Sequence, residues 1–282
     1  MSTMISLSSD FCTPMTEEQV RAACPYAFAE VPTNPDVSGK YIQANTATVI
    51  KDMAKMGWYP VQAKQCRAKK GSKGIRSFHM VAMQNDNVTI PGPDGKTEAY
   101  VRIIIQNSHD GFSSFKFMMG LYRCVCSNGL VVSDAEFTTF SIRHINYSFE
   151  ELLQVVNQAV AAVPGLCEKT VAMRNTVLSD EQKRELAVAT YKIRKGVTEE
   201  DKVKVDDATI ADLLTPVRKE DNGDSLWNVF NVLQEKMIKG GFSATGKNGK
   251  VRKQRSIKSI RKDTEYNQQL WAVAESYMAV AA

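Results

Sequence analysis

Histidine is the residue type in this sequence best suited to acid–base or metal chemistry. The chain has three histidines, His79, His109 and His144. His109 precedes Asp110 in the segment NSHDG, and a histidine beside a carboxylate could act as a general base or a metal ligand. The same segment is rich in turn-forming residues, and a hairpin turn with capping side chains accounts for it more simply. We therefore assign no catalytic or metal-binding residue.

Two cysteines, Cys124 and Cys126, are spaced so that their side chains would point the same way on a strand. Paired thiolates can bind zinc or a soft metal, but no second pair follows at zinc-finger spacing. We expect ordinary buried strand cysteines. Six cysteines in 282 residues are too few for a disulfide scaffold, so we expect reduced thiols and a cytoplasmic location.

Sequence fingerprints of nucleotide-dependent and hydrolytic enzymes are missing. The sequence contains no GxxxxGK[ST], GxSxG, HExxH or CxxC pattern. We therefore expect no cofactor and no enzymatic activity. A metal-dependent nuclease using His79, His109 and Asp110 is a weaker alternative, because acidic metal ligands are not clustered in the sequence.

Lysine and arginine gather in two blocks that contain no acid. Residues 236–262 hold ten cations, which leaves a net charge of −5 for the rest of a chain whose total is +5. Residues 64–76 hold six more. Blocks of one sign repel themselves unless a polyanion neutralises them, although either block alone could be a solvated loop or a lysine-protected edge strand. Two such blocks in a mildly acidic remainder favour nucleic acid as the partner.

The candidate nucleic-acid-binding residues are these cations with one aromatic ring. Glycines and lysines in GGFSATGKNGK suit a loop that follows phosphates, with Phe242 available to stack on a base. Trp58, Tyr59, Phe78 and Tyr122 could add an aromatic platform, although for each of them alone a core position is the better explanation. The candidate set is Lys64, Arg67, Lys69, Lys70, Lys73, Arg76, Phe242, Lys247, Lys250, Arg252, Lys253, Arg255 and Lys258.

The elements that position these residues begin after an irregular stretch. Residues 1–44 carry four of the nine prolines, and we expect an arm there. Apolar residues at helical spacing predict a helix from Asn45 to Gly57. Alternating and β-branched runs then predict strands over residues 58–66, 75–83, 100–106, 115–126, 130–132 and 137–144, with a loop over 85–97.

From Ser148 the pattern becomes helical. Capping-box spacing at Ser148 and Ser179 starts two helices, the first ending at Pro164–Gly165. Further helices are predicted near 209–214, from Ser225 and from Asp263. Strands followed by helices indicate an α+β fold: an N-terminal arm and helix, an antiparallel β-rich middle sheet, and C-terminal helices packed on it. We expect one domain over 45–282 (β-rich 58–146, helical 148–282), with 236–262 a mobile basic loop.

Six segments together carry a resemblance to a known family. They are NTATVIKDMAKMGWYPVQAKQCR at 45–67, NSHDG at 107–111, GLYRCVCSNGLVV at 120–132, LWNVFNVLQE at 226–235, RKQRSIKSI at 252–260 and NQQLW at 267–271. This set resembles an uncharacterised family carried by phages and plasmids, domain of unknown function 932. The resemblance implies a setting on mobile elements, and it carries over no catalytic residue.

These observations favour a phage-type DNA-transaction protein. We expect it to bind single-stranded DNA, with duplex DNA as a second candidate, and to act as a homo-oligomer in ATP-independent strand annealing during recombination or replication. The order of helix, strands and helix is compatible with annealing by analogy of fold. No apolar run approaches the ~18 residues of a membrane span, so no membrane partner is expected. The alternative is a protein-interaction factor whose basic loops bind an acidic surface on a host or defence protein.

Overall fold

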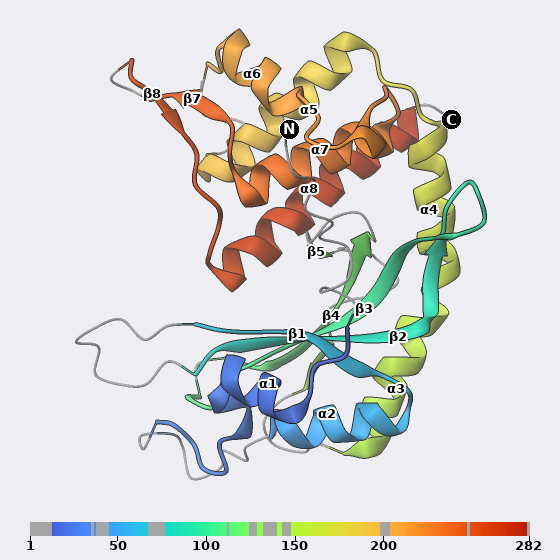
Figure 1. The fold of residues 1–282 in the computed structure, drawn as a ribbon, viewed down its shortest axis with the longest axis vertical. Coiled ribbons are helices and arrows are strands. Elements are labelled where there is room, and N and C mark those ends of the chain that lie inside the picture. The colour runs from blue at the N-terminus through green and yellow to red at the C-terminus, as the bar shows by residue number, and fades with distance from the viewer. Residues whose placement is uncertain are drawn as a thin grey trace, which may run out of the picture. The chain divides into compact units, whose positions relative to one another are not determined.

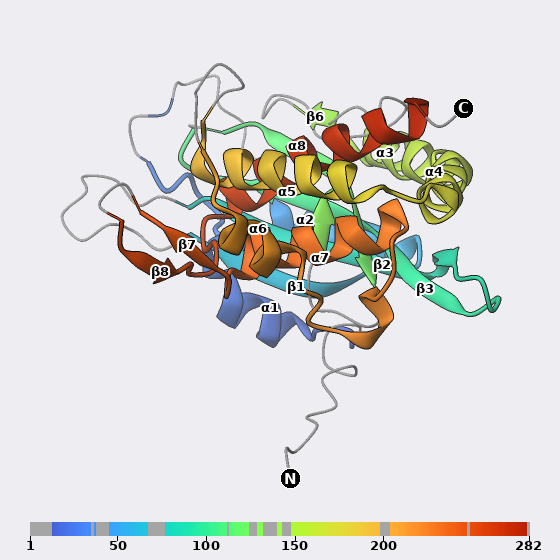
Figure 2. The same ribbon diagram turned by 90° about the horizontal axis from the view of Figure 1, so that it is seen from above.

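The structure is a computed structural model of the chain, shown in Figures 1 and 2. It describes residues 13–34, 37, 45–66, 77–111, 113–123, 129–131, 140–142, 148–197, 204–246 and 249–280. The chain forms two compact units, Met1–Pro164 and Gly165–Ala282. None of the helices in these residues combines the length and apolar character of a membrane span.

A six-stranded antiparallel sheet forms the centre of the first unit. Its strands are β1 (Tyr59–Gln65), β2 (His79–Pro91), β3 (Thr97–Asn107), β4 (Phe115–Arg123), β5 (Gly129–Val131) and β6 (Phe140–Ile142). Strands β1 to β5 are neighbours in chain order, and β6 pairs with the same strand, β4, as β5 does. The fold class is α+β with an antiparallel meander, and the β-branched run at 100–106 lies in its central strand, as the sequence predicted.

The register of the sheet separates two kinds of face. Val81, Ile105 and Phe117 are paired across three strands and lie on one face, and all three are buried. The neighbouring rows point to the other face, which carries the polar side chains of Gln84 and Arg102 in the row that ends at Gly120. Arg102 is buried there, donates to Gln84 at 2.8 Å, and stacks on the Tyr122 ring.

Helices α1 (Glu17–Ala23), α2 (Thr46–Lys55) and α3 (Phe149–Ala161) lie on one side of the sheet (Figure 1), and a 3₁₀ helix, η1 (Pro25–Phe28), follows α1. The predicted helix α2 starts at its N-cap Asn45, and α3 starts at Ser148, whose side chain accepts from the Glu151 N–H. The prediction of an irregular arm misses α1, which a capping box of Thr16 and Gln19 begins.

Strand β2 is longer than the sequence predicted. Residues 85–91 were assigned to a loop because of their turn-forming types, yet β2 continues to Pro91. The pairing with β3 shifts after Gln84, and the Asn87 N–H bonds the Asn85 side chain at 3.0 Å. These turn-forming residues therefore make a bulge within the strand, and the chain reverses only at Gly92–Lys96.

The second unit is helical. It contains α4 (Val163–Asn175), α5 (Asp180–Lys195), α6 (Asp207–Leu214), η2 (Lys219–Asp221), α7 (Leu226–Lys239) and α8 (Ile260–Val280). Ser179 and Gln182 form the predicted capping box of α5. Helix α4 was not predicted, because Pro164–Gly165 was interpreted as a helix end. Proline is compatible with the first turn of a helix, where its missing N–H would have no partner.

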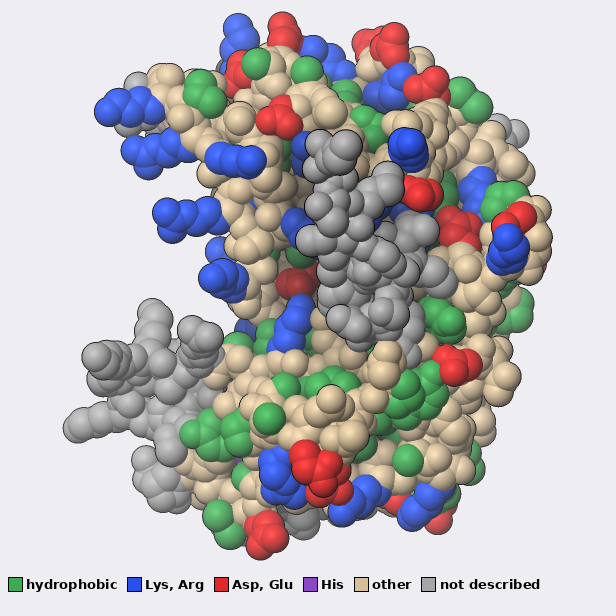
Figure 3. Space-filling view, in the orientation of Figure 1, with side chains coloured by type: hydrophobic (Ala, Val, Ile, Leu, Met, Phe, Trp, Pro, Cys, Tyr) green, Lys and Arg blue, Asp and Glu red, His purple; other side chains and the backbone are tan. Residues whose placement is uncertain are grey.

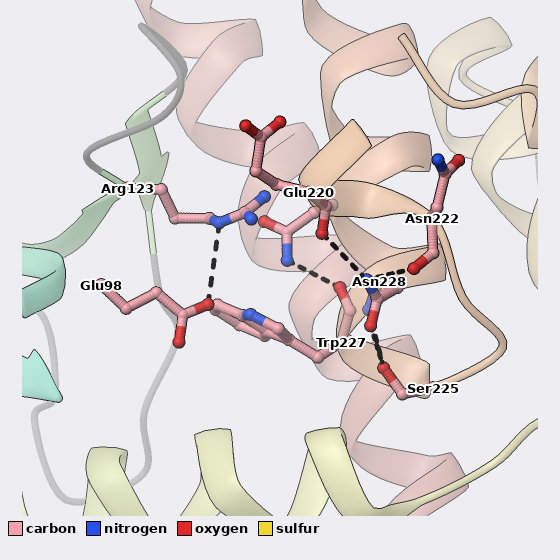
Figure 4. A network of polar contacts seen from close by, with 8 residues as sticks. Glu98, Arg123, Glu220, Asn222, Ser225, Trp227 and Asn228 are labelled. Atoms are coloured by element: carbon pink, nitrogen blue, oxygen red, sulfur yellow. Dashed lines mark hydrogen bonds and ion pairs between the residues drawn. The ribbon is translucent and has the colours of Figure 1, made fainter. Parts of the chain in front are cut away.

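The predicted start of α7 is fixed by side chains. Ser225 caps the helix, and the Asn228 amide donates to the backbone oxygens of Glu220 and Asn222 at 3.1 and 3.3 Å (Figure 4). The beginning of the segment LWNVFNVLQE is thus tied to the loop that precedes it.

Residues 236–262 are not the continuous loop that we predicted. They contain the end of α7, a two-stranded hairpin of β7 (Ser243–Thr245) and β8 (Val251–Lys253), and the start of α8. We call the β7–β8 hairpin the ribbon; it extends away from the helices of the second unit in both ribbon views. The mistake arose because glycine and lysine composition was taken to exclude regular pairing.

Candidate nucleic-acid interface

The second basic block divides into paired and exposed cations. Lys236 and Lys239 lie on α7 and bond Asp212 and Glu235, each at 3.1 Å. Lys247 lies outside the described residues. The cations that follow are all exposed, and they lie within residues 249–262, which we call the basic segment: Lys250, Arg252, Lys253, Arg255, Lys258, Arg261 and Lys262.

The basic segment has no internal acid to offset its charge. Among the described residues, the side chains of Arg252, Lys253 and Arg255 make no ion pair, and neither do those of Lys258 and Lys262. Figure 3 shows lysine and arginine side chains gathered over the ribbon and the stretch that leads to α8. Exposed like charges of this density attract a polyanion over a Debye length of ~10 Å.

Strand β7 anchors the ribbon to α6. The Ser243 N–H donates to Asp212 at 2.7 Å, and Ala244 is 2% exposed. Burial works to raise the pKa of Asp212, but the bonds from Ser243 and Lys236 outweigh it and hold the pKa below its usual range. The Thr209 N–H, together with the Thr209 and Thr245 hydroxyls, outweighs burial and lowers the pKa of Asp206, the N-cap of α6.

The base of the ribbon is held by Arg194 of α5 and by Gly241. Arg194 donates to the backbone oxygens of Met237 and Arg255. Gly241 and Gln254 continue the pairing beyond the strands, through a 2.9 Å bond from the Gly241 N–H to the Gln254 oxygen. The exposed cations therefore project from an ordered support.

Helix α5 adds cations that the sequence analysis did not select. Lys195 is exposed, and its Nζ lies 3.2 Å from the Gln254 side chain at the ribbon's base. Burial, and then the neighbouring Arg194, lower the pKa of Lys195. The available signal was the run YKIRKG at 191–196, in which cations gather at a helix end before a glycine.

Phe242 corrects the prediction of a stacking residue. Its side chain is 0% exposed and lies under Arg194, with 5.5 Å from the guanidinium carbon to the ring centroid. It is a core residue because it lies two residues before the buried Ala244, so both side chains point to the same inward face of the chain. Trp58, Phe78 and Tyr122 are buried as well, so they form no open aromatic platform.

The first basic block is described only in part. Lys64 lies on β1 opposite Met80 and is exposed. The other five candidates of this block lie outside the described residues: Arg67, Lys69, Lys70, Lys73 and Arg76. Cys124, Cys126 and His144 also lie outside them.

His79 belongs to a buried polar cluster at one end of the sheet. Its Nδ1 lies 2.6 Å from the backbone carbonyl oxygen of Ser77. A carbonyl oxygen can only accept a hydrogen bond, so Nδ1 carries the proton. Its Nε2 lies 2.8 Å from the hydroxyl of Thr46, and Asn107 donates to that hydroxyl at 2.9 Å. Burial, against the effects of Ser77 and Asp110, lowers the pKa of His79 to about 4.

The segment NSHDG completes this cluster. The Ser108 hydroxyl donates to Asp110 at 2.6 Å, and the His109 N–H donates to the Ser77 hydroxyl at 2.7 Å. The rings of His79 and His109 lie 5.3 Å apart. All of these side chains are buried, and the described residues contain no group of three or more histidine, cysteine, aspartate and glutamate side chains that could hold a metal. The contacts support a structural role for the motif.

Comparisons with known proteins cover most of the chain. The family described as Domain of unknown function (DUF932) matches residues 36–271. Two proteins of Escherichia coli (strain K12), UPF0380 protein YafZ and UPF0380 protein YfjQ, are each 28% identical over 265 residues, which is 94% of this chain and 92% of theirs. No solved structure matches.

Proposed function

The chain belongs to the DUF932 family, and we propose that it binds single-stranded DNA through the phosphate backbone, with the basic segment as the binding surface. The observation that carries the proposal is the exposed, acid-free set of cations on an ordered support. Phosphates would relieve the mutual repulsion of these cations and release counterions from the DNA. Binding at the segment therefore needs no cofactor.

We extend the proposal to strand annealing in DNA recombination or replication. The first unit contains α2, an antiparallel meander and α3 in this order, and this order of elements is the basis of the expected annealing activity. This support is an analogy of fold and involves no particular residue. The proposal retains the homo-oligomer, the cytoplasmic location and the mobile-element setting expected from the sequence.

The buried aromatic residues define the kind of binding that we expect. Stacking on exposed rings supplies about 1–3 kcal/mol per base in proteins that use it. Because Phe242, Trp58 and Tyr122 are buried, the proposed site relies on phosphates. Affinity should then depend steeply on salt and little on base composition.

A mobility-shift titration with labelled single-stranded DNA tests the proposal. With phosphate contacts dominating, log K should fall linearly with log salt, with a slope of about −0.7 for each contact. The same titration with duplex DNA of the same sequence separates the two ligands. Absence of any complex at ~50 mM salt would contradict the proposal and favour the alternative, an acidic protein surface as the partner of these cations.

Replacing Arg252, Lys253 and Arg255 together with alanine tests the position of the site. These side chains are exposed and make no described ion pair, so the melting temperature should barely change. The salt slope should become shallower by up to about 2, from three contacts of about 0.7 each.

The matched control replaces Lys51, Lys96 and Lys219, which are also exposed, and removes the same charge. Its salt slope should remain close to that of the parent. Equal weakening by the two triple variants would mean that net charge, and not the basic segment, governs binding.

A further inference from the structure

The two strands of the ribbon have different surroundings. Strand β7 is anchored to α6, whereas all three residues of β8 are exposed. β8 pairs with β7 alone in a two-stranded sheet, so it is an outer strand with solvent on both faces. What β8 presents is therefore available to a ligand.

Strand β8 presents cations on both faces. Arg252 pairs with Ala244 and Lys253 pairs with Ser243, and neighbouring residues on a strand point to opposite faces. Arg252 and Lys253 thus project in opposite directions. A single phosphate backbone running along one face would leave the other cation without a partner.

Val251 precedes these cations at the start of β8 and is 66% exposed. It pairs with Thr245 and shares a face with Lys253. An apolar side chain makes neither a hydrogen bond nor an ion pair with a phosphate, so phosphate binding alone does not explain Val251. A ligand that offers both apolar groups and phosphates accounts for Val251 and its neighbours together.

We propose that β8 enters the major groove of duplex DNA. This inference rests on the proposed DNA binding and adds a second ligand, the duplex product of annealing. The major groove is about 12 Å wide and admits a two-stranded ribbon, whereas the minor groove is only about 6 Å wide. Phosphates border the groove on both sides, and Arg252 and Lys253 reach one side each. Val251 contacts apolar groups of the groove, such as thymine methyls.

The anchoring of the ribbon favours this mode of binding. Asp212 holds β7 through the Ser243 N–H, and Arg194 holds the ribbon's base through backbone oxygens. An element that is ordered before it binds loses less conformational entropy in the complex.

Groove-specific competitors test the inference on the unmodified protein. The probe is a duplex of roughly 30 base pairs at ~50 mM salt, with the matching single strand as the second probe. Methyl green, a major-groove ligand, should displace the protein from the duplex, and netropsin, a minor-groove ligand, should not. Displacement by netropsin alone would overturn the inference.

Single substitutions on β8 supply the second measurement. Val251→Glu places a carboxylate among phosphates and should weaken duplex binding about tenfold or more. The control Val177→Glu changes a valine that is 73% exposed. Val177 forms a β-bridge with Ser225 at the start of α7, and the 14 residues of this helix, about 21 Å, separate that point from the end next to the ribbon. The Val177→Glu variant should therefore leave duplex affinity within about twofold of the parent.

Arg252→Ala and Lys253→Ala test the two faces. Each should make the duplex salt slope shallower by about 0.9, because each removes one phosphate contact. If only one of the two alanine variants changed the duplex salt slope, the groove geometry would be overturned. Equal weakening of duplex binding by Val251→Glu and Val177→Glu would overturn it as well.

The failures of the two proposals are distinguishable. If neither probe binds, the proposed DNA-binding function fails and the groove inference fails with it. If the single strand binds and the duplex does not, or if Val251→Glu leaves duplex affinity unchanged, the groove inference alone fails. Thermal melting of each variant ensures that lost binding reflects the interface and not unfolding.

Discussion

The environment of His79 suits only its neutral form. The ring donates from Nδ1 to the backbone oxygen of Ser77 and accepts at Nε2 from the Thr46 hydroxyl. That hydroxyl in turn accepts a hydrogen bond from Asn107. Both ring nitrogens are therefore satisfied without a charge, and the side chain is fully buried. Protonation would place a positive charge in this enclosed cluster, where desolvation penalises it.

Stability should consequently fall as the pH falls from 6.5 to 4. The pKa of His79 is about 4 in the folded protein and about 6.5 in the unfolded chain, so the unfolded state binds more protons in this window. The stabilisation is complete above pH 6.5, and about 3 kcal/mol is lost by pH 4. Urea unfolding at a series of pH values measures it.

His79→Gln is the control for this titration, since glutamine retains hydrogen bonding without titrating in the window. The variant should be less stable at neutral pH but should show a flatter pH dependence. Parallel pH profiles for the variant and the parent would show that other groups cause the loss.

Replacement of Phe242 separates a core role from base stacking. Because the ring is fully buried, Phe242→Ala should lower the free energy of unfolding by about 3–5 kcal/mol. Phe242→Leu should cost about 1.5 kcal/mol or less and leave affinity for single-stranded DNA within about twofold. If Phe242→Leu folds normally but loses DNA binding, the ring contacts a base after all.

Single residues were predicted with unequal success. The cations of residues 249–262 are exposed as predicted, because unpaired charges are costly to bury. Phe242 was assigned wrongly, because an aromatic ring beside glycines and lysines suits a stacking site as well as an anchor. Its spacing of two residues from Ala244 was the available signal, and only the burial of the ring and its contact with Arg194 of α5 decide between the two roles.

At the scale of elements, the ribbon depends on a close backbone approach at Gly240. Gly240 has φ +73°, and a Cβ there would lie 2.5 Å from the Gln254 oxygen and 2.8 Å from the Arg255 carbonyl carbon. Gly241 has φ +87°, but a Cβ there would meet nothing within 4 Å. The two adjacent glycines thus share a positive φ, which would strain any other residue, and they differ in the space left for a side chain.

Gly240→Ala should therefore destabilise the protein by more than Gly241→Ala. Strain at positive φ costs both variants about 1–2 kcal/mol, and the clash with backbone atoms adds at least about 1 kcal/mol at Gly240. Urea unfolding of both variants measures the difference, and Gly240→Ala should also weaken DNA binding. Equal losses would indicate that the ribbon's base moves freely to admit the methyl group.

Helix starts were the most predictable elements. Asn45, Ser148, Ser179 and Ser225 each cap a helix, because a side-chain oxygen satisfies an N–H that has no partner within the helix. The elements that were missed also depend on residues that begin or end helices and strands. The capping box of helix α1 follows a proline and was not recognised, and the proline at the second residue of α4 was interpreted as a helix end. Bulged β2 was cut short because its asparagines resemble a turn.

At the scale of the whole molecule, charge distribution was readable from the sequence and tertiary packing was not. A sequence shows where cations gather along the chain, but whether they meet an acid depends on packing. Asp212 neutralises Lys236 from a helix that is distant in sequence, whereas Arg252 meets no described acid. The proposed interface is therefore smaller than the predicted block, and it begins at the ribbon.

The sheet of the first unit should not be stable without α3. The strand rows with Val81 and Ile105 present an apolar face, and α3 buries Leu152, Val155, Val156 and Ala159. A fragment of residues 1–146 lacks these side chains and should aggregate, because a large apolar face cannot remain exposed to water. The matched fragment 1–164 retains α3 and the whole first unit, so it should remain soluble and melt cooperatively. Size-exclusion chromatography and circular dichroism melting compare the two. A stable monomer ending at residue 146 would mean that α3 is dispensable for this core.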